Sequence, residues 1–163
     1  NKGTLDYENY IGQTDHFSYQ QIYGHLYNML AGTGVPLDSL RYDTYSNKNE
    51  AITYRSFVEG FPIFNDQGYG TVQIQNNQDG AERYHFSLYS LQVPVAVNNK
   101  KTSLPSSAVV FNGLRNAGKL KEITGMRIGY DWKTNQGSNV VTLTPTYYLR
   151  YRGNWENYEN LIN

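Results

Sequence analysis

The stretch that decides the fold is residues 18–31, SYQQIYGHLYNMLA, which is followed by aromatic-rich segments at 40–43 (LRYD) and 52–55 (ITYR). Ser18 and Gln21 have the spacing of a capping box, in which each side chain can satisfy a free backbone amide at the helix start. The apolar residues that recur on one helical face are Ile22, Leu26, Met29 and Leu30. This pattern predicts a helix over Ser18–Ala31, with Ile22, Leu26 and Met29 buried, and then a pair of strands.

The same order of elements occurs a second time. Residues 106–116 (SSAVVFNGLRN) begin with serines that can cap a helix, and Val110 and Leu114 lie on one face of it. Strand-like segments follow at 126–131 (MRIGYD) and 140–143 (VVTL). Repeated helix-plus-hairpin units usually build one sheet with helices packed on one face. We therefore predict an α+β fold, with an antiparallel sheet and two helices at Ser18–Ala31 and Ser107–Asn116. Two repeats, roughly 17–91 and 104–158, would form it, and each resembles the PepSY-type unit of a helix followed by strands.

Further strands are predicted between and around these repeats. Leu5–Ile11 alternates loosely, and we expect it to pair with chain that lies outside this sequence. Segments 70–75 and 82–91 flank an Asp-Gly turn and predict a hairpin. Pro62 cannot donate to a central ladder, so it indicates an edge or a bend. The last hairpin is expected between 126–132 and 139–151.

Composition excludes several functions. The chain has 163 residues, which suits one domain, and no cysteine, which excludes disulfides and thiol chemistry. Lys+Arg and Asp+Glu both number 14, and this balance argues against binding to nucleic acid or to an anionic membrane surface. No window has the length of a membrane span and no signal peptide opens the chain. The chain begins with Asn1, followed by Lys2-Gly3-Thr4, so we expect it to be a piece of a longer protein.

The residues predict no catalytic, cofactor or metal site. His16, His25 and His85 lack the spacing of a metal pair, and no Gly-x-Ser-x-Gly elbow is present. Asp43 and Asp131 occupy matching places in the two repeats, which is more typical of strand-end acids than of a facing glycosidase pair. We therefore expect a protein that is not an enzyme.

The 16 tyrosines are the compositional anomaly, and they are densest near the end of the chain. Strand alternation places Tyr148, Arg150 and Arg152 on one face of the last long strand, with Trp155 beyond them. It places Tyr147, Leu149 and Tyr151 on the other face. Aromatic and arginine side chains are enriched in protein interfaces. The candidate partner-binding set is Tyr148, Arg150, Arg152 and Trp155, and the alternative is that they belong to the core.

Several segments in order resemble the C-terminal extracytoplasmic region of the YycH family. They are 52–55 leading into 59–64 (EGFPIF), 104–106 (LPS), 128–130 (IGY), 143–149 (LTPTYYL) and 151–155 (YRGNW). The sister family YycI has a related domain. It more often ends in an aromatic-Asn-Ala-type strand, whereas this chain ends in YENLIN, which favours YycH.

The resemblance implies a single-pass parent protein with an N-terminal transmembrane helix outside this chain and this domain on the extracytoplasmic face of a Gram-positive cell membrane. It implies association with YycI and modulation of the YycG (WalK) sensor histidine kinase, which controls cell-wall metabolism. The family offers no catalytic residues to carry over. The alternatives are a carbohydrate- or peptidoglycan-binding module, YycI itself and, more distantly, a hydrolase.

Overall fold

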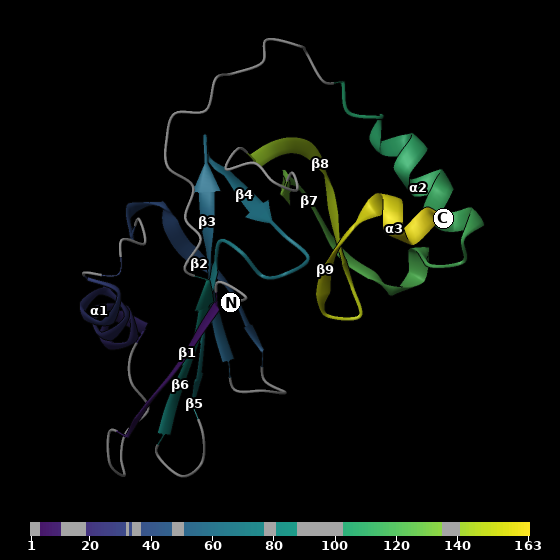
Figure 1. Ribbon diagram of the computed structural model, residues 1–163. Helices are drawn as coiled ribbons and strands as arrows, with labels where there is room; N and C mark the ends of the chain where they lie inside the picture. Colours follow the sequence, from purple (N-terminus) through teal and green to yellow (C-terminus); the bar gives the residue numbers. More distant parts are fainter. Residues whose placement is uncertain are drawn as a thin grey trace. The chain divides into compact units, whose positions relative to one another are not determined.

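The computed structural model describes residues 4–10, 19–31, 33, 37–46, 51–76, 81–87, 103–134 and 141–163 (Figure 1). They belong to two compact units. Unit 1 comprises Asn1–Gly60 and Asn65–Val95, and unit 2 comprises Phe61–Phe64 and Ala96–Asn163. Helices and strands occur in both, so the α+β class is confirmed.

Unit 1 is an antiparallel sheet with one helix. Its elements are β1 (Thr4–Tyr10), α1 (Tyr19–Leu30), the 3-10 helix η1 (Leu37–Ser39), β2 (Leu40–Ser46), β3 (Ala51–Val58), β5 (Thr71–Asn76) and β6 (Ala81–Ser87). The strands are ordered β1–β6–β5–β3–β2. The pairing of β1 with β6 corrects one expectation, because this strand pairs inside the chain rather than with a segment outside it.

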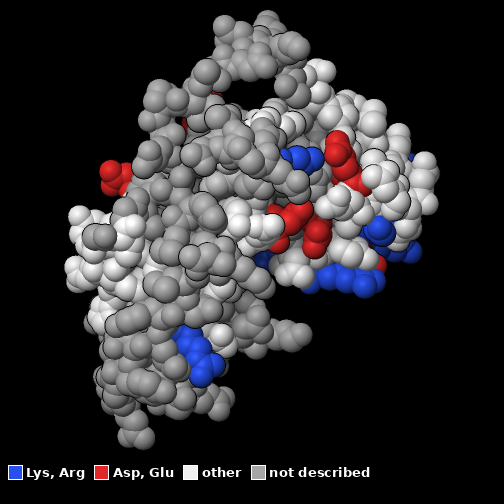
Figure 2. Space-filling view, viewed as in Figure 1, with Lys and Arg blue, Asp and Glu red and all other residues white. Residues whose placement is uncertain are grey.

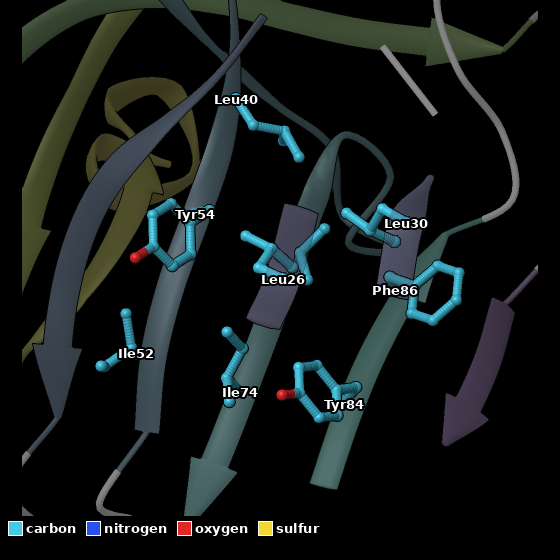
Figure 3. Packing of buried hydrophobic residues seen from close by; sticks show 9 residues of the cluster. Leu26, Leu30, Leu40, Ile52, Tyr54, Ile74, Tyr84 and Phe86 are labelled. Atoms are coloured by element: carbon cyan, nitrogen blue, oxygen red, sulfur yellow. The ribbon is translucent and has the colours of Figure 1, made fainter. Parts of the chain in front are cut away.

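Two rows of side chains across the middle strands of unit 1 meet α1. Register pairing places Ile52, Ile74 and Tyr84 in one row, and a second row consists of Tyr54, Val72 and Phe86. Leu26 and Leu30 of α1 point into these rows, and both are only 1% exposed (Figure 3). The predicted burial of Leu26 is confirmed, Met29 is half-buried, and the side chain of Ile22 lies outside the described residues.

Unit 2 has a four-stranded mixed sheet. Its elements are β4 (Phe61–Phe64), α2 (Ser107–Asn116), the 3-10 helix η2 (Leu120–Glu122), β7 (Ile123–Thr134), β8 (Val141–Tyr151), β9 (Asn154–Asn157) and α3 (Tyr158–Ile162). The strands are ordered β4–β7–β8–β9. The predicted hairpin between β7 and β8 is confirmed. The prediction of a purely antiparallel sheet was wrong, because β4 runs parallel to β7. The sequence analysis predicted two α-helices and missed a third, α3.

The helix α2 has the bounds that the sequence predicted. The Ser106 side chain accepts a hydrogen bond from the Val109 amide (3.4 Å), which satisfies one of the free donors of the first turn. Val110 and Leu114 are fully buried and pack with Leu149 of β8 and Leu161 of α3. These contacts place α2 and α3 on the same face of the unit 2 sheet.

A two-residue turn that the sequence reading missed adds β9 to the sheet. Tyr151 pairs with Asn154, and the two residues between them, Arg152 and Gly153, both have positive φ angles (49° and 89°). This is the geometry of a type I′ hairpin, whose backbone twist matches that of the flanking strands. The Asn157 side chain then accepts a hydrogen bond from the Glu159 amide (3.1 Å) and caps α3.

The internal repeat stays a prediction, as does the single domain over residues 1–163. Both units contain a helix, a 3-10 helix and two strands in that order: α1, η1, β2 and β3 in unit 1, and α2, η2, β7 and β8 in unit 2. Superposition of these two sets would test the repeat. Within the described ranges, none of the helices has the length and apolar character needed to cross a bilayer.

Candidate partner-binding face

The first predicted contact residue, Tyr148, is buried rather than exposed to solvent. Its side chain is 4% exposed, and its ring stacks on Phe64 of β4 with centroids 3.7 Å apart and planes 16° apart. Its hydroxyl donates to the Asp131 carboxylate (3.1 Å). The expectation that Tyr148 lies on the solvent side is therefore wrong, because a strand from elsewhere in the chain covers this ring.

Trp155 and Arg127 extend the same face toward β9. The guanidinium of Arg127 lies over the Trp155 ring (3.9 Å to its centroid) and near the Phe64 ring (4.8 Å). Gly125 leaves room for the indole, because a Cβ there would lie 3.4 Å from Trp155. Cation–π stacking of this kind is worth about 0.5–2 kcal/mol, more when water is excluded. We call Phe64, Arg127, Tyr148 and Trp155 the aromatic–arginine face.

The two remaining candidates differ in exposure. Arg150 is half-buried, and its carbonyl accepts a hydrogen bond from the Thr124 hydroxyl (3.2 Å). The Arg152 side chain is 66% exposed, yet its guanidinium is bound by Glu122 of η2 through two contacts of 2.5 and 3.1 Å. The structure thus brings Arg150 beside Trp155 by strand register and places Arg152 in the turn, paired with an acid.

The Glu122–Arg152 pair leads to a prediction about pH. Hydrogen bonding from Arg152, then its charge, holds the pKa of Glu122 below its ordinary value, and a weaker hydrogen bond from Tyr151 acts in the same direction. A carboxyl whose pKa is depressed on folding stabilises the protein above its unfolded pKa, and that stabilisation is lost as the pH falls through the folded pKa.

NMR titration of the Glu122 carboxyl should therefore give a pKa below that of an unpaired glutamate. In Arg152→Ala the pKa of Glu122 should rise toward its ordinary value. An unchanged Glu122 pKa in Arg152→Ala would contradict the pairing.

A glycine of β7 permits the close approach of β4. A Cβ at Gly129 would lie 2.7 Å from the Phe64 ring and 2.8 Å from the carbonyl oxygen of Pro62. The carbonyl is backbone and cannot rotate away. Gly129→Ala should therefore destabilise the protein by about 1–3 kcal/mol, as other overpacking substitutions do.

Chemical denaturation measures the effect of Gly129→Ala. Gly24→Ala is the control, because a Cβ at that helical position would meet nothing within 4 Å. Equal stability of Gly129→Ala and the parent protein would show that β4 does not approach β7 so closely.

The two candidate acids make ion pairs and hydrogen bonds within the fold, and two of the three histidines lie on described elements. Asp43 lies at a bulge in β2 and its carboxylate binds Arg55 (2.8 Å), whereas Asp131 accepts from Tyr148 and pairs with Lys133 (3.3 Å). His25 lies on α1 and His85 on β6, and His16 lies outside the described residues. In the part of the chain that the structure describes, no His, Asp and Glu side chains cluster in a way that could hold a metal ion.

Sequence reasoning missed Phe64 and Arg127 as members of this face. Phe64 belongs to a four-residue strand whose partner is β7, far along the chain. Arg127 lies in β7, a strand that was predicted correctly. Its guanidinium contacts the Trp155 ring, and this contact depends on the position of β9. No local signal in the sequence would have joined these side chains.

The chain is thus an α+β domain whose aromatic–arginine face is occupied mainly by internal contacts. The family model for the YycH protein, C-terminal domain, matches residues 1–162, and the chain belongs to this family. The crystal structure of YycH from Bacillus subtilis is similar, with a TM-score of 0.67 and 15% identity. The likeness covers 96% of this chain and 39% of that one, and at this identity it shows a shared fold. Among curated proteins there is no match.

Proposed function

We propose that this domain is a non-enzymatic extracytoplasmic regulatory domain that associates with YycI and modulates the YycG (WalK) sensor histidine kinase. The observation that carries the proposal is membership of the YycH C-terminal family over nearly the whole chain. The likeness of fold to the B. subtilis protein agrees with it. A parent protein anchored by one transmembrane helix would present the domain outside the cell membrane.

The contacts of the two candidate catalytic acids, Asp43 and Asp131, support a role without enzymatic activity. A glycosidase needs two carboxylates that face one cleft. Asp131 is instead engaged by Tyr148 and Lys133, and Asp43 by Arg55, so each acid contributes to packing in its own unit. Regulation without chemistry must then work by unequal affinity for the states of the kinase, directly or through YycI.

Binding to an immobilised YycI ectodomain, measured by biolayer interferometry, tests the association. We expect saturable binding with a defined stoichiometry, and no binding to an unrelated extracytoplasmic domain of similar size and charge. The second measurement is autophosphorylation of the full-length kinase in proteoliposomes, with YycI and this domain added alone and together. A rate that stays unchanged under all conditions would refute modulation of the kinase.

Three exposed tyrosines favour the second candidate function, a carbohydrate- or peptidoglycan-binding module. Tyr27 of α1 is 53% exposed, and Tyr42 and Tyr45 of β2 are 51% and 40% exposed. In register Tyr42 pairs with Tyr54 and Tyr45 with Ile52, so both lie on the α1 side of the unit 1 sheet. Calorimetric titration with muropeptides would detect such binding, and Tyr42→Ala should then weaken it. Absence of heat at millimolar ligand would eliminate this candidate.

A further inference from the structure

An apolar strip with partly exposed side chains lies on the helix-covered side of the unit 2 sheet. Met126 and Ile128 pair in register with Leu149 and Tyr147, so their side chains face the same side as α2 and α3. Leu149 is fully buried, whereas Met126 and Ile128 are 38% and 36% exposed.

The strip continues onto β4. Phe61 is 42% exposed, and its ring meets that of Tyr130 edge-on, with centroids 6.0 Å apart. Phe61 is two residues from Ile63, which pairs with Tyr130, so alternation places all three on the helix side. We call Phe61, Met126, Ile128 and Tyr130 the β7 strip.

The flank of α2 that lies opposite α3 also carries an exposed apolar residue. A Cβ at Gly113 would lie 3.0 Å from Ile162, so the Gly113 flank of α2 faces α3. Phe111 and Arg115, one helical turn apart, lie on the opposite flank. Phe111 is itself 37% exposed. The helix-covered side of the unit 2 sheet thus has an exposed apolar strand surface, and α2 has an exposed apolar flank, and a further helix could cover both.

The dimensions suit one helix. Neighbouring strands are about 4.8 Å apart, and packed helices lie about 8–10 Å from one another. The two paired strands β4 and β7 therefore offer about the width of one helix. Of the unit 2 helices that the structure describes, α2 and α3 pack on Leu149 of β8, and Met126 and Ile128 stay exposed beside them, so neither helix is the occupant.

The charge at one end of the strip indicates the chemistry of that occupant. Arg115, Lys119 and Lys121 lie at the end of α2 and in the η2 segment that leads into β7. Within the described ranges no carboxylate pairs with them, because the neighbouring acid, Glu122, binds Arg152. Figure 2 shows basic side chains gathered where Figure 1 places η2 and the β8–β9 turn.

We propose that the β7 strip and the Phe111 flank of α2 dock an acidic amphipathic helix of the partner protein YycI. The apolar face of that helix lies on Met126, Ile128 and Phe61, and its acidic residues lie toward Arg115 and Lys121. The inference rests on the proposed association with YycI and moves the contact from the largely packed aromatic–arginine face to the opposite face of the sheet. Helix-in-groove docking of this kind relies on a few apolar anchors, with charges that set specificity.

The test is the affinity of the full chain for the YycI ectodomain. Ile128→Glu should weaken binding by at least about 30-fold, which corresponds to loss of a central anchor. Val109→Glu introduces the same charge at an exposed apolar residue outside the proposed contact and is the matched control. Val109 is 59% exposed and lies one turn from Gly113, on the α3 flank of α2 rather than the Phe111 flank. Val109→Glu should change the affinity little, and neither variant should shift the unfolding midpoint appreciably.

The dependence of the association rate on ionic strength tests the contribution of the basic residues to binding. Association of the parent protein should slow as salt increases, and Arg115→Gln with Lys121→Gln should reduce this salt dependence because rim charges act mainly on the association rate. A salt dependence that is the same in parent and double variant would overturn the assignment of acidic residues to the partner helix.

The remaining outcomes also decide the matter. If the parent protein does not bind YycI, the proposed function fails and the inference fails with it. Binding that survives Ile128→Glu but is lost in Arg152→Ala would place the contact at the residue predicted from sequence and overturn the inference alone. Concentration-dependent dimers that Ile128→Glu dissociates would identify a second copy of this chain as the occupant and would also overturn it.

Discussion

Tyr148→Ala is expected to lower the free energy of unfolding by about 3–5 kcal/mol, the range for removal of a buried aromatic ring. The ring is 4% exposed and stacks on Phe64 at 3.7 Å, so its loss leaves a cavity between β8 and β4. Its hydroxyl is also a donor to the buried Asp131 carboxylate, which would be left with the Lys133 contact. Urea denaturation followed by tryptophan fluorescence measures the change, because Trp155 lies on the same face.

Tyr148→Phe separates the two contributions. It keeps the stacked ring and removes only the hydrogen bond to Asp131, so we expect a smaller loss of about 1–3 kcal/mol. If Tyr148→Ala were as stable as the parent protein, the ring would have to be exposed, and the original assignment of Tyr148 to a partner-binding surface would regain its basis.

The second large effect is expected in unit 1. Leu26→Ala should destabilise by about 2–5 kcal/mol, because Leu26 is 1% exposed and points into the rows of side chains on β3, β5 and β6 (Figure 3). The neighbouring residue provides the control: Tyr27 is 53% exposed, and Tyr27→Ala should change stability by no more than about 0.5 kcal/mol. Thermal unfolding by circular dichroism compares the two, and equal midpoints would contradict the placement of α1 on the sheet.

Local signals in the sequence were sufficient for the helices and hairpins that involve short separations along the chain. The capping serine and the spacing of Val110 and Leu114 predicted α2 with its observed bounds. Alternation correctly placed Tyr147 and Tyr148 on opposite faces of β8, since Tyr147 packs in the cluster around Leu149 and Tyr148 stacks on Phe64. Periodicity could assign residues to faces, but it could not say which face would be covered.

The errors arose where the structure depends on distant pairing or on an unusual turn. The solvent-side assignment of Tyr148 was wrong because β4 brings Phe64 over it through a parallel pairing with β7. The strand β9 was missed because its turn begins with Arg152, whereas the usual first residue of such a turn is Asn, Asp or Gly. Asn157, which caps α3, was a signal in the sequence that could have revealed that short helix.

The excursion of β4 has a consequence for how the protein is made. The chain contributes residues 61–64 to unit 2 and then returns to unit 1, so unit 2 is not formed by one continuous segment. During synthesis β4 leaves the ribosome well before β7 has been made. The two strands can pair only after the long segment between them has been synthesised and closed into a loop. Pairings between distant segments form late and slowly. A fragment that began at residue 103 would lack Phe64 and would leave the ring of Tyr148 without its stacking partner.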